Sequence, residues 1–224
     1  MRLGTYYRAE LFKWLNIKAN KENVLDVGCF DAYWLSTQTA KNKYALDINI
    51  DKKYEGINYI KASALDIPFE DNKFDQVFAF DVIEHVPQNT EEKFISELIR
   101  VAKNDSEIIF TVPSKNIKIF PNFLTNWINK KWGHFKYNGL SKNEIERYLK
   151  QFNNIEYKIE ESNGQYYLRN YLPLRLLWDF NQNFTKRIVR EIAKKDFENL
   201  KGSNGYYIVK IIRKYGHKNS FFSK

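Results

Sequence analysis

The sequence predicts a doubly wound α/β fold, in which a mostly parallel sheet lies between two layers of helices. The apolar segment 24–27 runs into a small-residue turn at Gly28, and a second apolar segment, 44–46, ends in Asp47. In such folds the glycine lets backbone approach a nucleotide, and the carboxylate takes the ribose hydroxyls. The dinucleotide pattern G-x-G-x-x-G is absent. We therefore expect an adenosine site and disfavour an NAD enzyme.

Seven strands can be placed along the chain from apolar runs bounded by turn residues. They are expected at 23–27, 43–47, 57–61, 74–80, 107–112, 155–161 and 206–213. An amphipathic helix over about residues 2–16 precedes them. Only nine residues separate Asp47 from Ile57, so the usual helix between the second and third strands is short or missing.

Helices are expected between most of the other strands. The first covers about residues 32–40, and the next runs from a cap at Asn89 or Thr90 to about residue 103. A third begins at Ser141, which forms a capping-box pattern with Glu144.

Two longer segments, 114–140 and 165–200, predict an α-helical cap on a single domain of residues 1–224. The first holds aromatic and aliphatic residues at helical spacing: Phe120, Phe123, Leu124, Trp127, Ile128 and Trp132. The second is an insertion with a helical core over about 174–200. Its expected apolar side consists of Leu177, Phe184, Ile188 and Ile192.

Charge is distributed unevenly along the chain. The net charge is +9, but residues 1–113 hold 14 Lys and Arg against 18 Asp and Glu, whereas residues 114–224 hold 22 against 9. This asymmetry indicates an anionic partner for the second half, such as a phosphorylated acceptor, nucleic acid or a membrane surface. The candidate cations are Lys186, Arg187, Arg190, Lys194 and Lys195. The alternative is a simple solvated surface.

The single cysteine excludes an internal disulfide and fits a reducing compartment. The first residues lack the pattern of a cleavable signal, and no apolar run approaches the ~20 residues that span a bilayer. We expect a cytoplasmic protein, either soluble or peripheral at the membrane.

Several motifs together resemble the class I S-adenosylmethionine-dependent methyltransferases. Beyond the first two strands, they are Ala62-Ser63-Ala64-Leu65-Asp66, Phe74-Asp75 and Asp81-Val82-Ile83-Glu84-His85. The segments Gly133-His134, Leu140-Ser141 and Glu144-Ile145 are similar to the ubiquinone and menaquinone biosynthesis branch. The resemblance covers about residues 22–160. It implies the class I fold with S-adenosylmethionine as cofactor.

Candidate cofactor residues follow from the strand ends and from this resemblance. Asp47 would bind the ribose, Gly28 would leave room for the amino-acid end, and Asp26 would orient the glycine loop. Ile48 could pack on the adenine, and the resemblance places Ser63 and Ala64 beside its edge. Phe80, at the end of the fourth strand, completes the set: Asp26, Gly28, Asp47, Ile48, Ser63, Ala64 and Phe80.

The glycine loop departs from the pattern of the family. The usual G-x-G-x-G is replaced by Gly28-Cys29-Phe30-Asp31-Ala32. Phe30 is compatible with cofactor binding only if its side chain turns away from the donor. Cys29 lies in this loop without an evident base, so we expect a structural role for it.

Methyl transfer from a sulfonium needs alignment and, for some acceptors, a base. His85 is the first candidate base because imidazole ordinarily titrates near neutral pH, and His134 is the second. A structural role for His85 is the alternative. No residue cluster has the spacing of a zinc site or suggests magnesium.

The acceptor can be narrowed by two missing features. The N-P-P-[YFW] tetrapeptide of nucleobase amine methylation does not follow the fourth strand, and no cysteine is placed for base C5 chemistry. We therefore expect O-methylation of a small-molecule, saccharide or lipid-linked acceptor. The alternatives are an RNA methyltransferase, or a non-catalytic membrane- or nucleic-acid-binding module that retains the fold.

Overall fold

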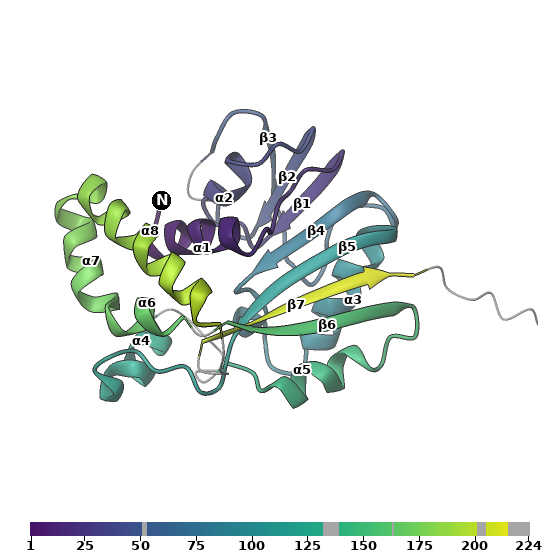
Figure 1. Ribbon diagram of the computed structural model, residues 1–224. Coiled ribbons are helices and arrows are strands. Elements are labelled where there is room, and N and C mark those ends of the chain that lie inside the picture. The colour runs from purple at the N-terminus through teal and green to yellow at the C-terminus, as the bar shows by residue number, and fades with distance from the viewer. Residues whose placement is uncertain (51–52, 132–138, 163, 201–204, 215–224) are drawn as a thin grey trace, which may run out of the picture.

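The computed structural model describes residues 1–50, 53–131, 139–162, 164–200 and 205–214. Its strands are β1 Asn23–Val27, β2 Asn42–Asp47, β3 Ile57–Lys61, β4 Phe74–Phe80, β5 Ala102–Pro113, β6 Ile155–Ser162 and β7 Tyr206–Arg213. They form one sheet in the order β3-β2-β1-β4-β5-β7-β6 (Figure 1). The pairs among β1 to β5 are parallel, and β7 runs antiparallel to both of its neighbours. The predicted doubly wound, mostly parallel sheet is confirmed.

Helices cover both faces of this sheet. Successive side chains of a strand point to opposite faces, so β1 contributes to two cores. Leu25 and Val27 pack with α3 (Glu91–Val101) and α5 (Lys142–Leu149), whereas Val24 packs on the face of α1 (Leu3–Trp14) and α2 (Tyr33–Ser36). Asp26 alternates with its neighbours and therefore shares the face of Val24.

The starts of α5 and α3 were predicted with different success. The capping box of α5 is confirmed, since Ser141 and Glu144 bond each other's backbone N–H groups. At α3 the N-cap is Thr90, but its side chain does not cap the helix. Its hydroxyl instead donates to the carbonyl of Pro87 at 2.6 Å.

The predicted helix over 32–40 is wrong in length, because α2 ends at Ser36. The hydroxyls of Ser36 and Thr37 donate to the carbonyls of Tyr33 and Trp34, each at 2.7 Å. Side chains that bond the preceding turn in this way compete with helix continuation. The helix start is also displaced, since Ala32 adopts the left-handed conformation.

The cap consists of η2 (Asn122–Leu124), α4 (Thr125–Lys131), α6 (Gln165–Arg169), α7 (Tyr171–Phe180) and α8 (Gln182–Glu198). The helical core expected over 174–200 is confirmed, and it consists of two helices that are separated at Asn181, whose Oδ1 accepts from the Phe184 N–H at 3.0 Å. The expected apolar side is right for Ile192, which is buried, but wrong for Phe184, which is 53% exposed. The residues that α8 buries are Thr185, Val189, Ile192, Ala193 and Asp196.

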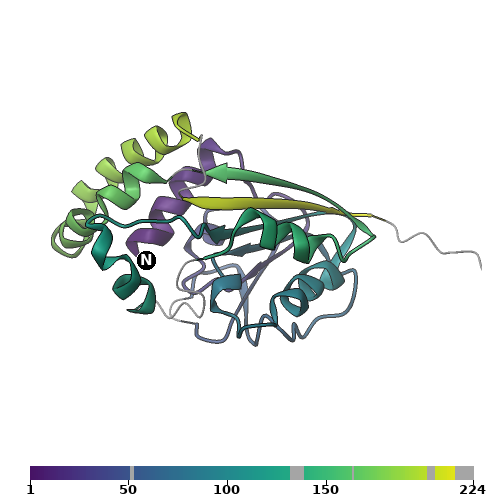
Figure 2. The same ribbon diagram turned by 90° about the horizontal axis from the view of Figure 1, so that it is seen from below.

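The cap lies at the end of the sheet where β1 and β4 finish, as Figures 1 and 2 show. Helix α1 joins the two parts, because Ala9 and Phe12 pack on the sheet while Leu3 and Leu11 pack into the cap. No helix within the described residues is both long and apolar enough to cross a bilayer.

Candidate functional site

The loop after β1 keeps the backbone of a glycine loop although only its first residue is glycine. Gly28 has φ +70°, and Phe30 and Ala32 both have φ +48°. Positive φ is strained for residues with a Cβ, so other contacts must hold these two positions. The Arg2 guanidinium carbon lies 3.5 Å from the centroid of the Phe30 ring, and the Asp31 carboxylate accepts from the Tyr33 N–H at 3.1 Å.

Gly28 is fixed by its surroundings as well as by its backbone conformation. Its N–H donates to the carbonyl of Leu46 in β2 at 2.7 Å. A Cβ built at Gly28 would lie 2.4 Å from Cγ2 of Val82. The position therefore excludes every side chain.

Asp47 connects the end of β2 to this loop. Its Oδ2 accepts from the Phe30 N–H at 2.8 Å, and its Oδ1 accepts from the Asn49 N–H at 2.8 Å. A carboxylate has about four acceptor sites. Both oxygens of Asp47 thus keep capacity to accept from a pair of ribose hydroxyls.

A buried cluster of acids lies beside the loop. Arg8 of α1 forms an ion pair with Asp81, which follows β4 and also accepts from the Thr111 hydroxyl at 2.7 Å. Burial raises the pKa of Asp26 to about 8; Arg8 opposes the shift, and Asp47 adds to it.

Glu84 is the most unusual member of this cluster. It belongs to η1 (Ile83–His85), it is fully buried, and neither of its carboxyl oxygens has a hydrogen-bond partner among the residues that the structure describes. Burial raises its pKa well above the usual range, and Asp81 adds to the effect. The three acids Asp26, Asp81 and Glu84 outnumber Arg8, the cation beside them. Such a cluster favours a positively charged ligand, and S-adenosylmethionine carries positive charge on its sulfonium and ammonium groups.

The other predicted cofactor residues lie at the same edge of the sheet. Ile48 follows β2 and is 59% exposed, so its side chain is open to a ligand. Ser63 and Ala64 follow β3, the neighbour of β2, and the Ser63 hydroxyl accepts from the Leu65 N–H at 3.1 Å. Phe80 lines a small cavity of about 20 Å³ together with Asp26 and Gly28.

The candidate bases and nucleophile are placed as follows. His85 is exposed at the end of η1, and His134 lies outside the described residues. Cys29 is buried, and burial raises the pKa of its thiol, which does not suit a nucleophile. Within the described part of the chain, no group of three or more His, Cys, Asp and Glu could hold a metal ion.

The sequence interpretation missed Arg8 as a member of the site. An arginine in an amphipathic helix carries no signal that it will reach a strand end far along the chain. Asp81 and Glu84 were visible in a motif, but the proximity of Arg8 to both of them was not.

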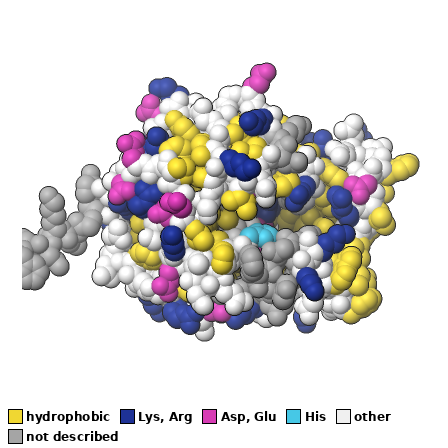
Figure 3. Space-filling model, turned by 180° about the vertical axis from the view of Figure 1, so that it is seen from behind, with side chains coloured by type: hydrophobic (Ala, Val, Ile, Leu, Met, Phe, Trp, Pro, Cys, Tyr) yellow, Lys and Arg dark blue, Asp and Glu magenta, His cyan; other side chains and the backbone are white. Residues whose placement is uncertain are grey.

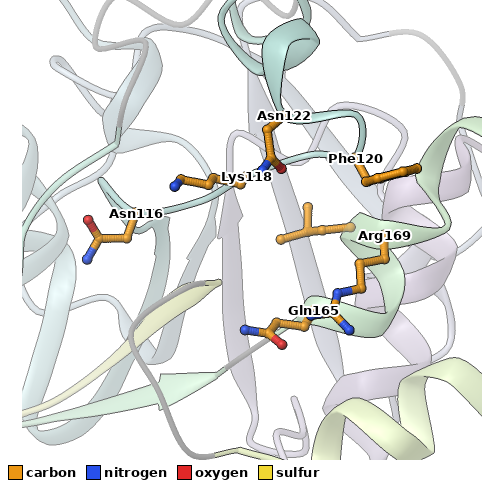
Figure 4. Close-up of a pocket in the computed structure, with 7 residues that line it drawn as sticks. Asn116, Lys118, Phe120, Asn122, Gln165 and Arg169 are labelled. Carbon is orange, nitrogen blue, oxygen red and sulfur yellow. The ribbon is translucent and has the colours of Figure 1, made fainter.

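A larger cavity of about 830 Å³ lies in the cap (Figure 4). One wall is the segment after β5, where Ile117 and Ile119 are buried while Lys118 and Phe120 are exposed. Lys118 and Phe120 both line the cavity. The other wall is α6, and the complete lining is Asn116, Lys118, Phe120, Asn122, Gln165, Leu168 and Arg169.

The cavity is positively charged and rich in amides. Gln165 and Arg169 are four residues apart on α6 and so share one face. Within the described residues, no carboxylate forms an ion pair with Lys118 or Arg169. Two cations with amide neighbours and the exposed ring of Phe120 suit an anionic, hydroxylated ligand.

Three of the five cations expected on α8 contact other groups of the protein. Arg190 donates to the Tyr6 hydroxyl at 2.9 Å, and Lys194 lies 3.9 Å from Glu198. Lys186 lies over the Tyr6 ring at 5.8 Å. Much of this helix's charge is therefore directed at α1 or at its own carboxylates.

A protein-family model described as a methyltransferase domain matches residues 18–110, which include β1 to β4 and most of β5. Over residues 18–110 the chain is therefore similar to the methyltransferase domain family. The arrangement of the sheet is that of a class I methyltransferase, as predicted. The loop at Gly28 and the acids Asp47, Asp81 and Glu84 all fall inside the matched residues.

Curated relatives match only part of the chain. An uncharacterised protein of Methanocaldococcus jannaschii is 34% identical over 96 residues, which is 42% of this chain and 41% of that protein. A chloroplastic tocopherol O-methyltransferase of Arabidopsis thaliana is 42% identical over 67 residues, which is 30% of this chain and 19% of that enzyme. The chain thus covers less than half of the length of either relative.

Among solved structures, the phosphoethanolamine N-methyltransferase 2 of Haemonchus contortus, in complex with S-adenosylmethionine, has a similar fold. The TM-score is 0.61 at 15% identity, over 94% of this chain and 53% of that one. At this identity the likeness concerns the fold alone.

Proposed function

We propose that this protein is an S-adenosylmethionine-dependent methyltransferase that methylates an oxygen of a small-molecule, saccharide or lipid-linked acceptor. The observation that carries the proposal is the geometry of Asp47. Its carboxylate is bonded to the loop of Gly28 and still has acceptor capacity for two ribose hydroxyls, within a domain of the methyltransferase family.

The residues present fit this cofactor. Asp47 would hold the ribose, the bare backbone of Gly28 would admit the amino-acid end, and exposed Ile48 would cover one face of the adenine. The acids around Arg8 suit the positive charge of the ligand. When bound, the cofactor supplies an electrophilic methyl group. The protein's part is to align that group with the acceptor and to exclude water.

The cap cavity supports an anionic acceptor. Lys118 and Arg169 would bind a phosphate or carboxylate, and the amides of Asn116, Asn122 and Gln165 would bind hydroxyls. The tocopherol O-methyltransferase among the relatives is consistent with an oxygen acceptor, and the ubiquinone and menaquinone branch remains a prediction.

The alternative activity is methylation of RNA, which the positive charge of residues 114–224 favours.

A non-catalytic role is the rival that the altered loop favours. Phe30 and Ala32 nevertheless have positive φ angles, a conformation that glycine adopts readily. The altered loop therefore has a backbone conformation that suits glycine, and this supports a protein that still binds its cofactor.

The proposal is tested by titrating the purified protein with S-adenosylmethionine, S-adenosylhomocysteine and NAD, followed by an acceptor screen with labelled methyl donor. We expect heat from the first two ligands and none from NAD. No heat from either adenosyl ligand at millimolar concentration would refute the proposal. Donor binding without transfer to small molecules, glycans or lipids, but with transfer to RNA, would favour the RNA rival.

We expect Asp47→Ala to weaken donor binding by about 1.5–3 kcal/mol, roughly 10- to 150-fold in Kd, because hydrogen bonds to charged groups are the stronger kind. Asp47→Asn, which keeps one oxygen acceptor, should lose less. Asp66→Ala removes an exposed carboxylate from the neighbouring loop and serves as the control. Equal affinities for all four proteins would show that Asp47 does not bind the donor.

Donor affinity should also depend on the protonation of Asp26. Its pKa of about 8 means that it is mostly neutral at pH 6–7, whereas a bound cation favours its charged form. Binding should therefore release a proton, and affinity should rise with pH by up to about tenfold per unit between about pH 5.5 and 7.5. Calorimetry in two buffers of different ionisation enthalpy measures this release. Asp26→Asn should remove both effects, and a flat profile for the native protein would contradict the coupling.

The raised pKa of Asp26 also affects the stability of the ligand-free protein. Because the folded pKa of Asp26 is raised, its contribution to stability is complete below about pH 4 and is lost as pH rises through about 8. Asp26→Asn should not show this loss in chemical denaturation measured across the same range.

A further inference from the structure

The cap exposes an unusual number of large apolar side chains. Phe180 is 90% exposed, Phe123 is 80% and Leu176 is 74%. Phe120, Trp127 and Phe184 are also more than half exposed. We call these six residues the cap rim. Single exposed apolar residues are ordinary, but a group of this size on adjacent elements marks an interaction surface.

The two halves of the rim belong to one body. Ile119 and Ile128, from the segment of η2 and α4, share an apolar cluster with Leu174 and Trp178 of α7. The outer sides of both elements therefore lie at the same end of the molecule, which Figures 1 and 2 show for α4 and α7. In Figure 3, hydrophobic and basic side chains gather together at the right-hand end of the molecule.

The charge of this end is strongly positive. Segments 116–131 and 165–181 hold five cations, Lys118, Lys130, Lys131, Arg169 and Arg175, against a single acid, Asp179. Arg175 lies 3.4 Å from Asp179, and Lys131 lies 5.3 Å from the centre of the Trp127 ring. Aromatic and aliphatic tips between basic side chains are the pattern of a surface that inserts shallowly among anionic headgroups.

We propose that the cap rim docks on an anionic lipid bilayer. The six apolar side chains enter the interfacial region, and the five cations contact the headgroups. The cavity of Lys118 and Arg169 opens beside Phe120, so it faces the same surface. If the proposed function holds, a lipid-linked acceptor reaches the cavity from the membrane.

Other partners fit the rim less well. A second copy of this chain would bring five cations against five cations, which repel each other. RNA would neutralise the cations but would leave Leu176 and the tips of Phe123 and Phe180 in water. A bilayer satisfies both the charge and the apolar surface.

The experiment is co-sedimentation of the full chain with vesicles of pure phosphatidylcholine and with vesicles that also contain roughly one third phosphatidylglycerol. We expect binding to the anionic vesicles that falls as salt is raised, and little binding to the neutral ones. Phe123→Ser with Phe180→Ser should lower the affinity roughly tenfold or more, because the variant lacks two rings that the bilayer would bury. The remaining binding should stay sensitive to salt.

Charge variants measure the electrostatic contribution to vesicle binding separately from the apolar one. Lys130→Gln with Lys131→Gln, two exposed cations outside the cavity, should lower vesicle affinity roughly fivefold per cation. Lys18→Gln with Lys93→Gln removes two cations outside the cap and should change little. Donor affinity, measured by calorimetry on every variant, should equal that of the native protein, which keeps this test separate from that of the proposed function.

Three outcomes would overturn the docking proposal. They are no binding to anionic vesicles at low salt by protein that binds the donor, equal binding by the rim variants and the native protein, and binding to an RNA oligonucleotide but not to vesicles. Failure to bind the donor, with vesicle binding retained, would instead refute the proposed function and leave the docking surface intact.

Discussion

Gly28→Ala should destabilise the protein by roughly 2–5 kcal/mol and reduce donor binding below detection. Two costs add at this position. A residue with a Cβ at φ +70° costs about 1–2 kcal/mol, and the new methyl would lie 2.4 Å from Val82 Cγ2, an overlap that costs about 1–3 kcal/mol. Any relief of the overlap moves the loop that holds Asp47. Chemical denaturation and calorimetry with the donor measure both effects.

The chain offers a control that isolates the cost of the backbone. Gly56 has the same φ of +70°, but a Cβ there meets nothing within 4 Å. Gly56→Ala should therefore cost about 1–2 kcal/mol and leave donor binding unchanged. Adding Val82→Ala to Gly28→Ala should recover the overlap cost only. If Gly28→Ala and Gly56→Ala proved equally mild, the close approach of Val82 to Gly28 would be incorrect.

The strands were predictable because their signal is local. β1, β3, β4 and β7 begin and end at the predicted residues, since each is an apolar run bounded by polar or turn residues. β5 begins earlier than expected, at Ala102, which pairs with Phe74 ahead of a register shift between the two strands. That extension depends on the neighbouring strand, and the segment itself does not show it.

The helix ends and part of the site were less predictable, because they depend on side-chain contacts that the hydrophobic pattern does not show. The end of α2 depends on two hydroxyls that bond backward, and the buried face of α8 depends on how it packs against α1. Asp47 and Gly28 could be proposed from the sequence because parallel strand ends meet at one edge. The contact of Arg8 with Asp81 joins residues 73 positions apart and has no local signal.

His85→Ala should lower methyl transfer by roughly 10²–10⁴-fold, which is the usual contribution of a general base. His85 follows β4 at the edge that also carries Asp26, Gly28 and Asp47, where ligands of open α/β sheets bind. Its side chain is exposed, whereas Glu84 beside it is fully buried. An oxygen acceptor that must lose a proton would find a base there, and the native rate should rise with pH through neutrality.

The exposure of His85 separates this role from a structural one. Truncating an exposed side chain usually changes stability by less than about 0.5 kcal/mol, so His85→Ala should unfold at nearly the native temperature and bind the donor with native affinity. His85→Gln keeps the polarity without the base, and its rate should fall as far as that of His85→Ala. Turnover that survives in both variants would exclude His85 as the base. The base would then be His134, or the acceptor oxygen would be ionised before it binds. A rate that stays pH-dependent in both variants and is lost in His134→Ala would identify the first case, and a pH-independent rate would identify the second.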